Sequence, residues 1–237
     1  MRVSIHQPHY LPWLPYLGKI VQSDVFILLD DVEFTRNGWQ NRNKIKTSQG
    51  PLVLTVPVKH KLGQWIQQVE VSDQNWRKKH WASFQQAYRK APYFERYRAE
   101  LEAFWSVPWQ GLSDPCCSMI EWLLQKLEVA PKLLRSSQLQ VESRSSQRLV
   151  QLVKAAGGSG YLSGRHALQA YLDPHVFEPE GLELTLFDWS CPTYPQLHGG
   201  EFVSNLAALD ALLNLGPEKT LQIAREGGRV ERFSNSR

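Results

Sequence analysis

Residues 2–32 read RVSIHQPHYLPWLPYLGKIVQSDVFILLDDV, and this segment indicates the architecture of the chain. Residues 2–6 are short, β-branched and bounded by a proline, which predicts a strand. Apolar residues recur at helical spacing from 13 to 22, and residues 24–32 form a nearly continuous apolar run of strand length. Such a run is typical of a strand buried on both faces, so we predict a βαβ unit and a parallel sheet.

The remainder of the chain alternates between strand and helix patterns. Strands are predicted at 41–47 and 51–58 around a turn signal at 48–50, with a possible third at 65–71. Amphipathic helices are predicted at 74–90, 92–105 and 114–127, with Asp114 as the N-cap of the last. The α/β alternation then returns, with strands at 131–137, 161–164 and 182–189, helices at 146–158 and 205–216, and a turn or helix at 167–172.

The chain has 237 residues, of which 42% are hydrophobic, so it is long enough to bury a substantial core. We predict a single α/β domain at residues 1–228. Its sheet is expected to be mainly parallel and Rossmann-like, with a β-hairpin and a helical insertion in the middle. The polar residues 229–237 are expected to form a loose C-terminal tail.

Composition argues against several classes of function. No run of about 18 apolar residues is present, which predicts no membrane span, and the first residues lack the apolar core of a secretory signal. Three cysteines, two of them adjacent, make no disulfide framework and favour a cytoplasmic location. A net charge of +4 without a dense basic tract is compatible with an anionic small molecule and gives no support for nucleic acid. The sequence contains no CxxC or HxxxH spacing, so it predicts no metal site. No motif identifies a cofactor.

Polar side chains follow the predicted strands at their carboxyl ends, where parallel sheets bind ligands. The candidates at these ends are His6, Gln7, Tyr10, Asp30, Ser163 and Gly164. Three prolines stiffen the loop after the first strand, which would hold its histidine and amide in place for a ligand. The alternative is a proline-rich turn with its aromatic rings packed inward.

A second group of candidates lies in the predicted β-hairpin, at Trp39, Asn41, Arg42 and Lys44. Amides can recognise a polar ligand by paired donors and acceptors, and cations can hold a phosphate or carboxylate. The alternative is a solvated hairpin of alternating charge. Asp210 interrupts the apolar stripe of the helix at 205–216, where it either serves a site or makes a structural pair. Cys191 is expected to be an ordinary free thiol.

Several segments of the chain, taken in order, resemble the WbqC-like protein family. The segments are HQPHYLPWLPYLGKI, LLDDVEFTRNGWQNRNKIK with LTVPVK, WRKKHWASFQQAYRKAPYF, YLSG and EFVSNLAALDALLNLG. The resemblance implies a bacterial, cytoplasmic protein of O-antigen or other surface-polysaccharide biosynthesis. It implies a transferase that moves an acyl or aminoacyl group to an amino or nucleotide sugar. The site positions it implies are His6, Gln7, Tyr10, Asp30, Trp39, Asn41, Arg42, Ser163, Gly164 and Asp210. The chain departs from the family pattern at Ala207, where a serine is typical, and at 165–173, where a glycine-richer loop is typical.

Three hypotheses about function remain open from the sequence. In the first, the protein is a group-transfer enzyme in which His6 is the general base, Asp30 or Asp210 orients it or holds the acceptor, and Arg42 and Lys44 bind an anion. In the second, it is a nucleotidyltransferase or ligase-like enzyme, although the loop after the first strand lacks a HxGH sequence. In the third, it is a non-catalytic binding subunit of a polysaccharide assembly complex.

Overall fold

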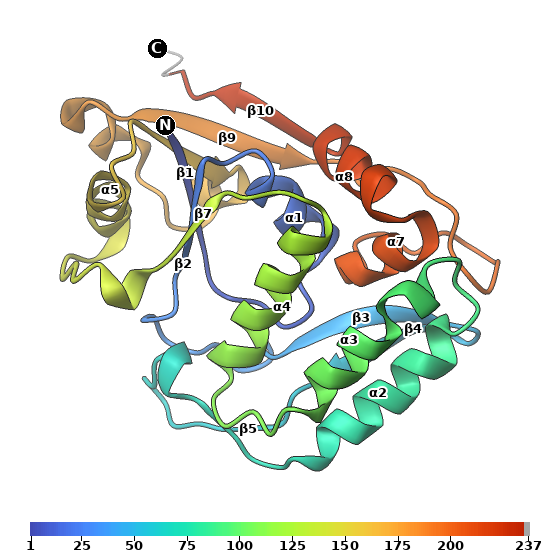
Figure 1. The fold of residues 1–237 in the computed structure, drawn as a ribbon. Helices are drawn as coiled ribbons and strands as arrows, with labels where there is room; N and C mark the ends of the chain where they lie inside the picture. Colours follow the sequence, from blue (N-terminus) through green and yellow to red (C-terminus); the bar gives the residue numbers. More distant parts are fainter. Residues whose placement is uncertain (235–237) are drawn as a thin grey trace.

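A six-stranded sheet forms the centre of the computed structural model, which describes residues 1–234. Its strand order is β10-β9-β8-β1-β2-β7 (Figure 1). The strands are β1 (Arg2–His6), β2 (Val25–Leu28), β7 (Lys132–Arg135), β8 (Gly160–Gly164), β9 (Glu183–Trp189) and β10 (Gly228–Arg232). All neighbours pair in parallel except β10, which is antiparallel to β9. The prediction of an α/β fold with a mainly parallel sheet is therefore confirmed.

The order of the strands creates a point of divergence in the middle of the sheet. From β1 the chain adds β2 and then β7 on one side, and it later adds β8 and β9 on the other side of β1. The loops that leave β1 and β8 therefore run in opposite directions from neighbouring strands. In parallel sheets such a reversal leaves a crevice at the carboxyl ends of the two strands.

The two faces of the sheet are covered by different helices, which produces two hydrophobic clusters. Val3 and Ile5 of β1 pack in the smaller cluster, together with residues of α5 (Ser145–Ala155). Phe26 and Leu28 of β2 pack in the larger cluster, together with α1 (Leu14–Ile20) and the segment inserted between β2 and β7. Because side chains alternate along a strand, β2 needs apolar residues on both faces, which explains its continuous apolar run.

The inserted segment forms a separate layer beside the sheet, in the lower half of Figure 1. It contains the antiparallel pairs β3 (Arg42–Thr47) with β4 (Gly50–Thr55) and β5 (Val58–Lys59) with β6 (Glu70–Val71). Its helices are α2 (Asn75–Tyr88), α3 (Phe94–Ser106) and α4 (Ser113–Lys126). Within the predicted third strand at 65–71, Glu70–Val71 form the strand β6 and Ile66–Gln68 form a 3₁₀ turn. Leu112 rather than Asp114 is the N-cap of α4.

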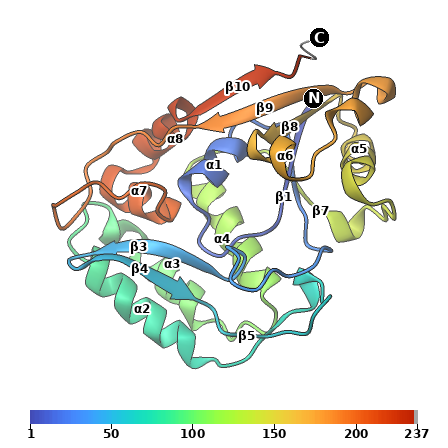
Figure 2. The same ribbon diagram turned by 180° about the vertical axis from the view of Figure 1, so that it is seen from behind.

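The C-terminal part of the chain folds back onto the sheet. It comprises α6 (His166–Ala170), α7 (Ala208–Leu215), α8 (Pro217–Glu226) and β10. Figure 2 shows α1 and α6 in front of the central strands of the sheet. The prediction of a loose tail from residue 229 differs from the structure, because β10 pairs with β9 along its whole length. A polar edge strand and a polar loop share the same composition, so polarity alone did not separate them. Residues 235–237 of the predicted tail lie outside the described residues.

Candidate functional site

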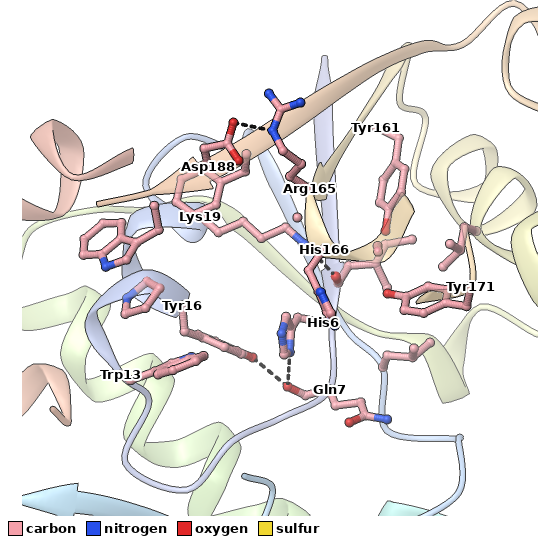
Figure 3. A pocket seen from close by; sticks show the side chains of 18 of the residues that line it. His6, Gln7, Trp13, Tyr16, Lys19, Tyr161, Arg165, His166, Tyr171 and Asp188 are labelled. Atoms are coloured by element: carbon pink, nitrogen blue, oxygen red, sulfur yellow. Dashed lines mark hydrogen bonds and ion pairs between the residues drawn. The ribbon is translucent and has the colours of Figure 1, made fainter. Parts of the chain in front are cut away.

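A cavity of about 830 Å³ lies at the carboxyl ends of β1, β8 and β9. It occupies the crevice that the divergence of β1 and β8 leaves at this edge, and its volume is typical of a small-molecule site. Figure 3 shows side chains from α1, β1, β8 and α6 around it. Its polar lining residues are His6, Gln7, Tyr16, Lys19, Tyr161, Arg165, His166, Tyr171 and Asp188.

His6 is presented to the cavity as a neutral imidazole with one defined free nitrogen. Its Nδ1 lies 3.1 Å from the backbone oxygen of Gln7. Because a carbonyl oxygen only accepts, Nδ1 carries the ring proton and Nε2 keeps its lone pair. Burial and the nearby charge of Lys19 lower the pKa of His6 to about 4. The ring is therefore neutral at physiological pH, with Nε2 available to accept a proton.

Gln7 is held at both its backbone and its side chain, so the start of the loop after β1 is rigid. Its backbone oxygen also accepts a hydrogen bond from the Tyr16 hydroxyl at 3.1 Å (Figure 3). Its side-chain Oε1 accepts a hydrogen bond from Gln40 Nε2 at 2.8 Å. This leaves the Nε2 amide group of Gln7 as a positioned donor at the cavity wall.

Lys19 lines the same wall, although the sequence analysis did not single it out. It is only 6% exposed, and its Nζ donates to the backbone oxygen of Ile5 at 3.0 Å. Burial lowers the pKa of this amine to about 7. One signal in the sequence was available, since Lys19 lies between the buried Leu17 and Ile20 on a short helix. A lysine within the apolar face of a helix is unusual and marks a group that is withdrawn from water.

The cavity lining also carries an ion-pair cluster around Arg165. Its Nε lies 2.6 Å from Asp188 Oδ2, and its Nη2 lies 2.6 Å from Glu231 Oε2 on β10. The strand that was predicted as a loose tail therefore helps to neutralise this arginine. Next to Arg165, a Cβ added at Gly164 would meet no atom within 4 Å, so the cavity is open at this point.

Three of the residues predicted from the sequence line the cavity: His6, Gln7 and Gly164. Two more, Trp39 and Arg42, connect to its rim through Trp13, which is a lining residue. The Trp13 and Trp39 rings stack with centroids 5.8 Å apart, and the Arg42 guanidinium lies 5.7 Å from the centroid of Trp39. The predicted hairpin residues thus extend the wall of the site away from the cavity, and their role in binding stays a prediction.

Four other predicted residues do not line the cavity: Tyr10, Asn41, Lys44 and Ser163. Tyr10 is fully buried, with its hydroxyl 2.8 Å from His80 Nδ1. Asn41 is buried and donates from Nδ2 to a backbone oxygen at 2.9 Å. Lys44 lies in β3, and its backbone oxygen accepts from Ala207 at 3.0 Å. The hydroxyl of Ser163, which is also buried, lies 3.3 Å from the backbone oxygen of Gly164.

The two predicted carboxylates also lie away from the cavity lining, and both hold separate segments together. Asp30 is 1% exposed and accepts hydrogen bonds from Ser136 and Ser137, which follow β7. Asp210 is fully buried in α7, and burial raises its pKa. Its two oxygens accept hydrogen bonds from tyrosine hydroxyls at 2.7 and 2.9 Å, those of Tyr88 on α2 and Tyr194. Catalytic roles for both carboxylates stay predictions.

The fold is that of an α/β protein with a ligand-sized cavity at the carboxyl edge of a mostly parallel sheet. The chain belongs to the WbqC-like protein family, whose profile matches residues 7–222. It is 33% identical over 226 residues to an uncharacterized protein, Rv1507c, of Mycobacterium tuberculosis (strain ATCC 25618 / H37Rv), with 92% of this chain and 95% of that protein covered. No solved structure gives a significant match. In residues 1–234, no helix is both long and apolar enough to cross a membrane.

Proposed function

We propose that this protein is a group-transfer enzyme that moves an acyl or aminoacyl group to an amino or nucleotide sugar in surface-polysaccharide biosynthesis. The observation that carries the proposal is His6, a neutral imidazole with Nδ1 anchored and Nε2 free at a ligand-sized cavity. An imidazole in this state serves as a general base. The proposed reaction takes place between two ligands that share the cavity.

In the proposed step, the amine of the acceptor attacks the carbonyl carbon of the donor. A nitrogen–carbon bond forms, the bond from the carbonyl carbon to the leaving group breaks, and the amine proton passes to His6 Nε2. The attacking nitrogen becomes strongly acidic as its new bond forms, so a base with a lowered pKa can accept the proton. His6 then returns the proton to the leaving group, which balances the reaction. In the proposal the Gln7 amide donates a hydrogen bond to the ligand. The ring of Trp13, on which Trp39 stacks, packs against the flat face of the ligand.

A second candidate function is favoured by the strand order. Numbered in order of appearance in the chain, the five parallel strands are arranged 3-2-1-4-5. This matches five of the six positions in the Rossmann order 3-2-1-4-5-6. Rossmann-like sheets bind nucleotides at the reversal of strand order, which is where this cavity lies. A nucleotidyltransferase or ligase-like enzyme would use the same cavity for ATP or CTP. A non-catalytic binding subunit would bind ligand there without turnover.

The test is turnover by the full chain and by two matched histidine variants. Purified protein is incubated with acyl or aminoacyl donors and amino-sugar nucleotides, or with ATP and CTP, and products are identified by mass spectrometry. The His6→Asn substitution removes Nε2, while the asparagine amide can still donate a hydrogen bond to the backbone oxygen of Gln7. We expect kcat to fall about 100-fold or more, with a melting temperature that is unchanged within a few degrees.

The control is His175→Asn, which changes an exposed histidine that does not line the cavity. Full activity is expected from this variant. Full turnover by His6→Asn would remove His6 from the mechanism, and release of pyrophosphate or AMP would select the nucleotidyl-transfer alternative.

A further inference from the structure

The cationic groups at the cavity differ in how their charges are compensated. Arg165 has two carboxylate partners, Asp188 and Glu231, each at 2.6 Å. Lys19 forms none of the ion pairs found in residues 1–234. Its one hydrogen bond goes to the backbone oxygen of Ile5, and an ammonium has three donors. Lys19 is therefore a buried cation that lacks a counter-ion within the described part of the chain.

A buried ammonium without a partner is unfavourable, because the loss of its hydration is not repaid by a nearby negative charge. Its neighbour His6 is neutral and adds no negative charge. The carboxylate that does line the cavity, Asp188, is held by Arg165. A ligand that enters the cavity is the remaining source of a counter-ion, and the chain presents the amine at the wall where such a ligand would lie (Figure 3).

We propose that Lys19 is the anion-binding group of this cavity and that it takes a carboxylate or a phosphate-like oxyanion of the ligand as its counter-ion. The proposal rests on the proposed use of the cavity as a substrate site and names the ligand class. The sequence analysis assigned anion recognition to Arg42 and Lys44, neither of which lines the cavity. Lys19 supplies the positive charge at the cavity itself.

The proposal implies that anion binding is linked to proton uptake. The free amine has a pKa of about 7, and a bound anion raises the pKa of the group that it contacts. An anion that binds only the protonated amine therefore has constant affinity well below pH 7. Above pH 7 its affinity falls about tenfold for each pH unit, because the amine must first take up a proton.

Sulfate and acetate are suitable probes because neither changes its charge between pH 6.0 and 8.5. Sulfate represents a tetrahedral oxyanion and acetate a carboxylate, so the two titrations distinguish the sources of the anion. Binding to the full chain is measured by calorimetry and by thermal shift. For the anion that fits, we expect the dissociation constant to rise about 30-fold between pH 6.0 and 8.5. At pH 7 we expect uptake of about half a proton, measured by comparing buffers of different ionisation enthalpy.

Lys19→Met removes the charge and preserves the length of the side chain, and Lys78→Met is the matched control at an exposed lysine. We expect Lys19→Met to bind the anion at least 30-fold more weakly at pH 6.0 and Lys78→Met to bind it like the unmodified chain. In a further measurement, the lysines of the chain without substitutions are ¹³C-methylated. The resonance of Lys19 should shift when the anion is added. This measurement keeps the test valid if the methionine variant folds poorly.

Equal binding by Lys19→Met, a pH-independent affinity, or no binding of either anion would overturn the proposal. The outcome is separate from that of the proposed function, because binding is measured without turnover. If anion binding requires Lys19 and no donor is ever turned over, the anion site stands and the transferase proposal fails. If His6→Asn abolishes turnover and Lys19→Met binds anions normally, the transferase stands and the anion site fails.

Discussion

The buried amine of Lys19 reduces the stability of the free protein. Its pKa is lowered from 10.5 to about 7 in the folded state, so the unfolded chain binds the proton more tightly. The resulting destabilisation is fully present below pH 7. It is lost as the pH rises from about 7 to 10.5, where the unfolded chain also releases the proton. A group that weakens the fold in this way is typical of a functional site.

We expect Lys19→Met to increase the free energy of unfolding at pH 6 by on the order of 1–3 kcal/mol, because an apolar side chain removes the buried charge. The gain should shrink as the pH rises toward 10, where the lysine is neutral in the folded state. Urea unfolding at several pH values measures both effects, with Lys78→Met as the control. A variant that is less stable than the unmodified chain at pH 6 would contradict this account of Lys19.

At the level of helices and strands, the site depends on how closely α1 approaches β9 and α8. Gly18 makes this approach possible, since a Cβ at this position would lie 2.5 Å from a ring carbon of Trp189. It would also lie 2.9 Å from the backbone oxygen of Ala224 on α8. The same helix carries Tyr16 and Lys19 to the cavity, and Trp189 lines it. The packing at Gly18 therefore fixes the distance between α1, which carries Tyr16 and Lys19, and Trp189, which also lines the cavity.

Gly18→Ala should destabilise the protein by about 1–3 kcal/mol, because the added methyl group must displace a packed ring and a backbone oxygen. Alanine favours a helix over glycine by up to about 1 kcal/mol, so a net loss would show that the steric clash dominates. Urea unfolding of this variant is compared with that of Gly111→Ala, where the nearest atom to the new methyl group is 3.5 Å away. An unchanged or raised stability for Gly18→Ala would disprove the close approach.

Across the whole molecule, buried histidines make the fold sensitive to acid. Burial lowers the pKa of His6 and His80 to about 4 and that of His9 well below 6.5. Between pH 6.5 and 4 the unfolded chain binds protons that the folded chain does not bind. Stability is therefore fully present above pH 6.5 and is lost as the pH falls toward 4. The raised pKa of Asp210 acts in the opposite sense, because the folded state holds that proton more tightly.

We expect the free energy of unfolding to fall steeply between pH 6.5 and 4.5, by about 1.4 kcal/mol per pH unit for each buried histidine. His80→Gln should reduce this slope, since glutamine can still hydrogen bond to Tyr10 and does not titrate. The exposed His175→Gln should leave the slope unchanged. Stability measured by urea unfolding at half-unit pH steps gives the slopes, and a flat profile for the unmodified chain would refute the argument.

The local pattern of the chain was sufficient for the five parallel strands of the sheet and for part of the site. Alternation and apolar runs located the strands, and the βαβ unit at residues 2–32 placed His6 and Gln7 at a carboxyl edge, where both line the cavity. The edge strand β10 was missed because its polarity resembles that of a loop. Lys19 was missed because a lysine on a short helix is ordinarily solvated, and its burial depends on segments that pack over α1.

Strand and helix periodicity depends on neighbours in sequence, so the class of fold and the carboxyl-edge position of His6 could be derived from residues alone. The state of each polar group depends instead on which distant segments remove its water or supply its counter-ion. Asp210 is paired with a tyrosine 122 residues away, and Arg165 is neutralised by a carboxylate 66 residues away. Lys19 receives no such partner in the described chain. Long-range packing therefore decides that Asp210 and Arg165 have partners and that Lys19 has no counter-ion among the described residues, and the local sequence pattern does not contain this information.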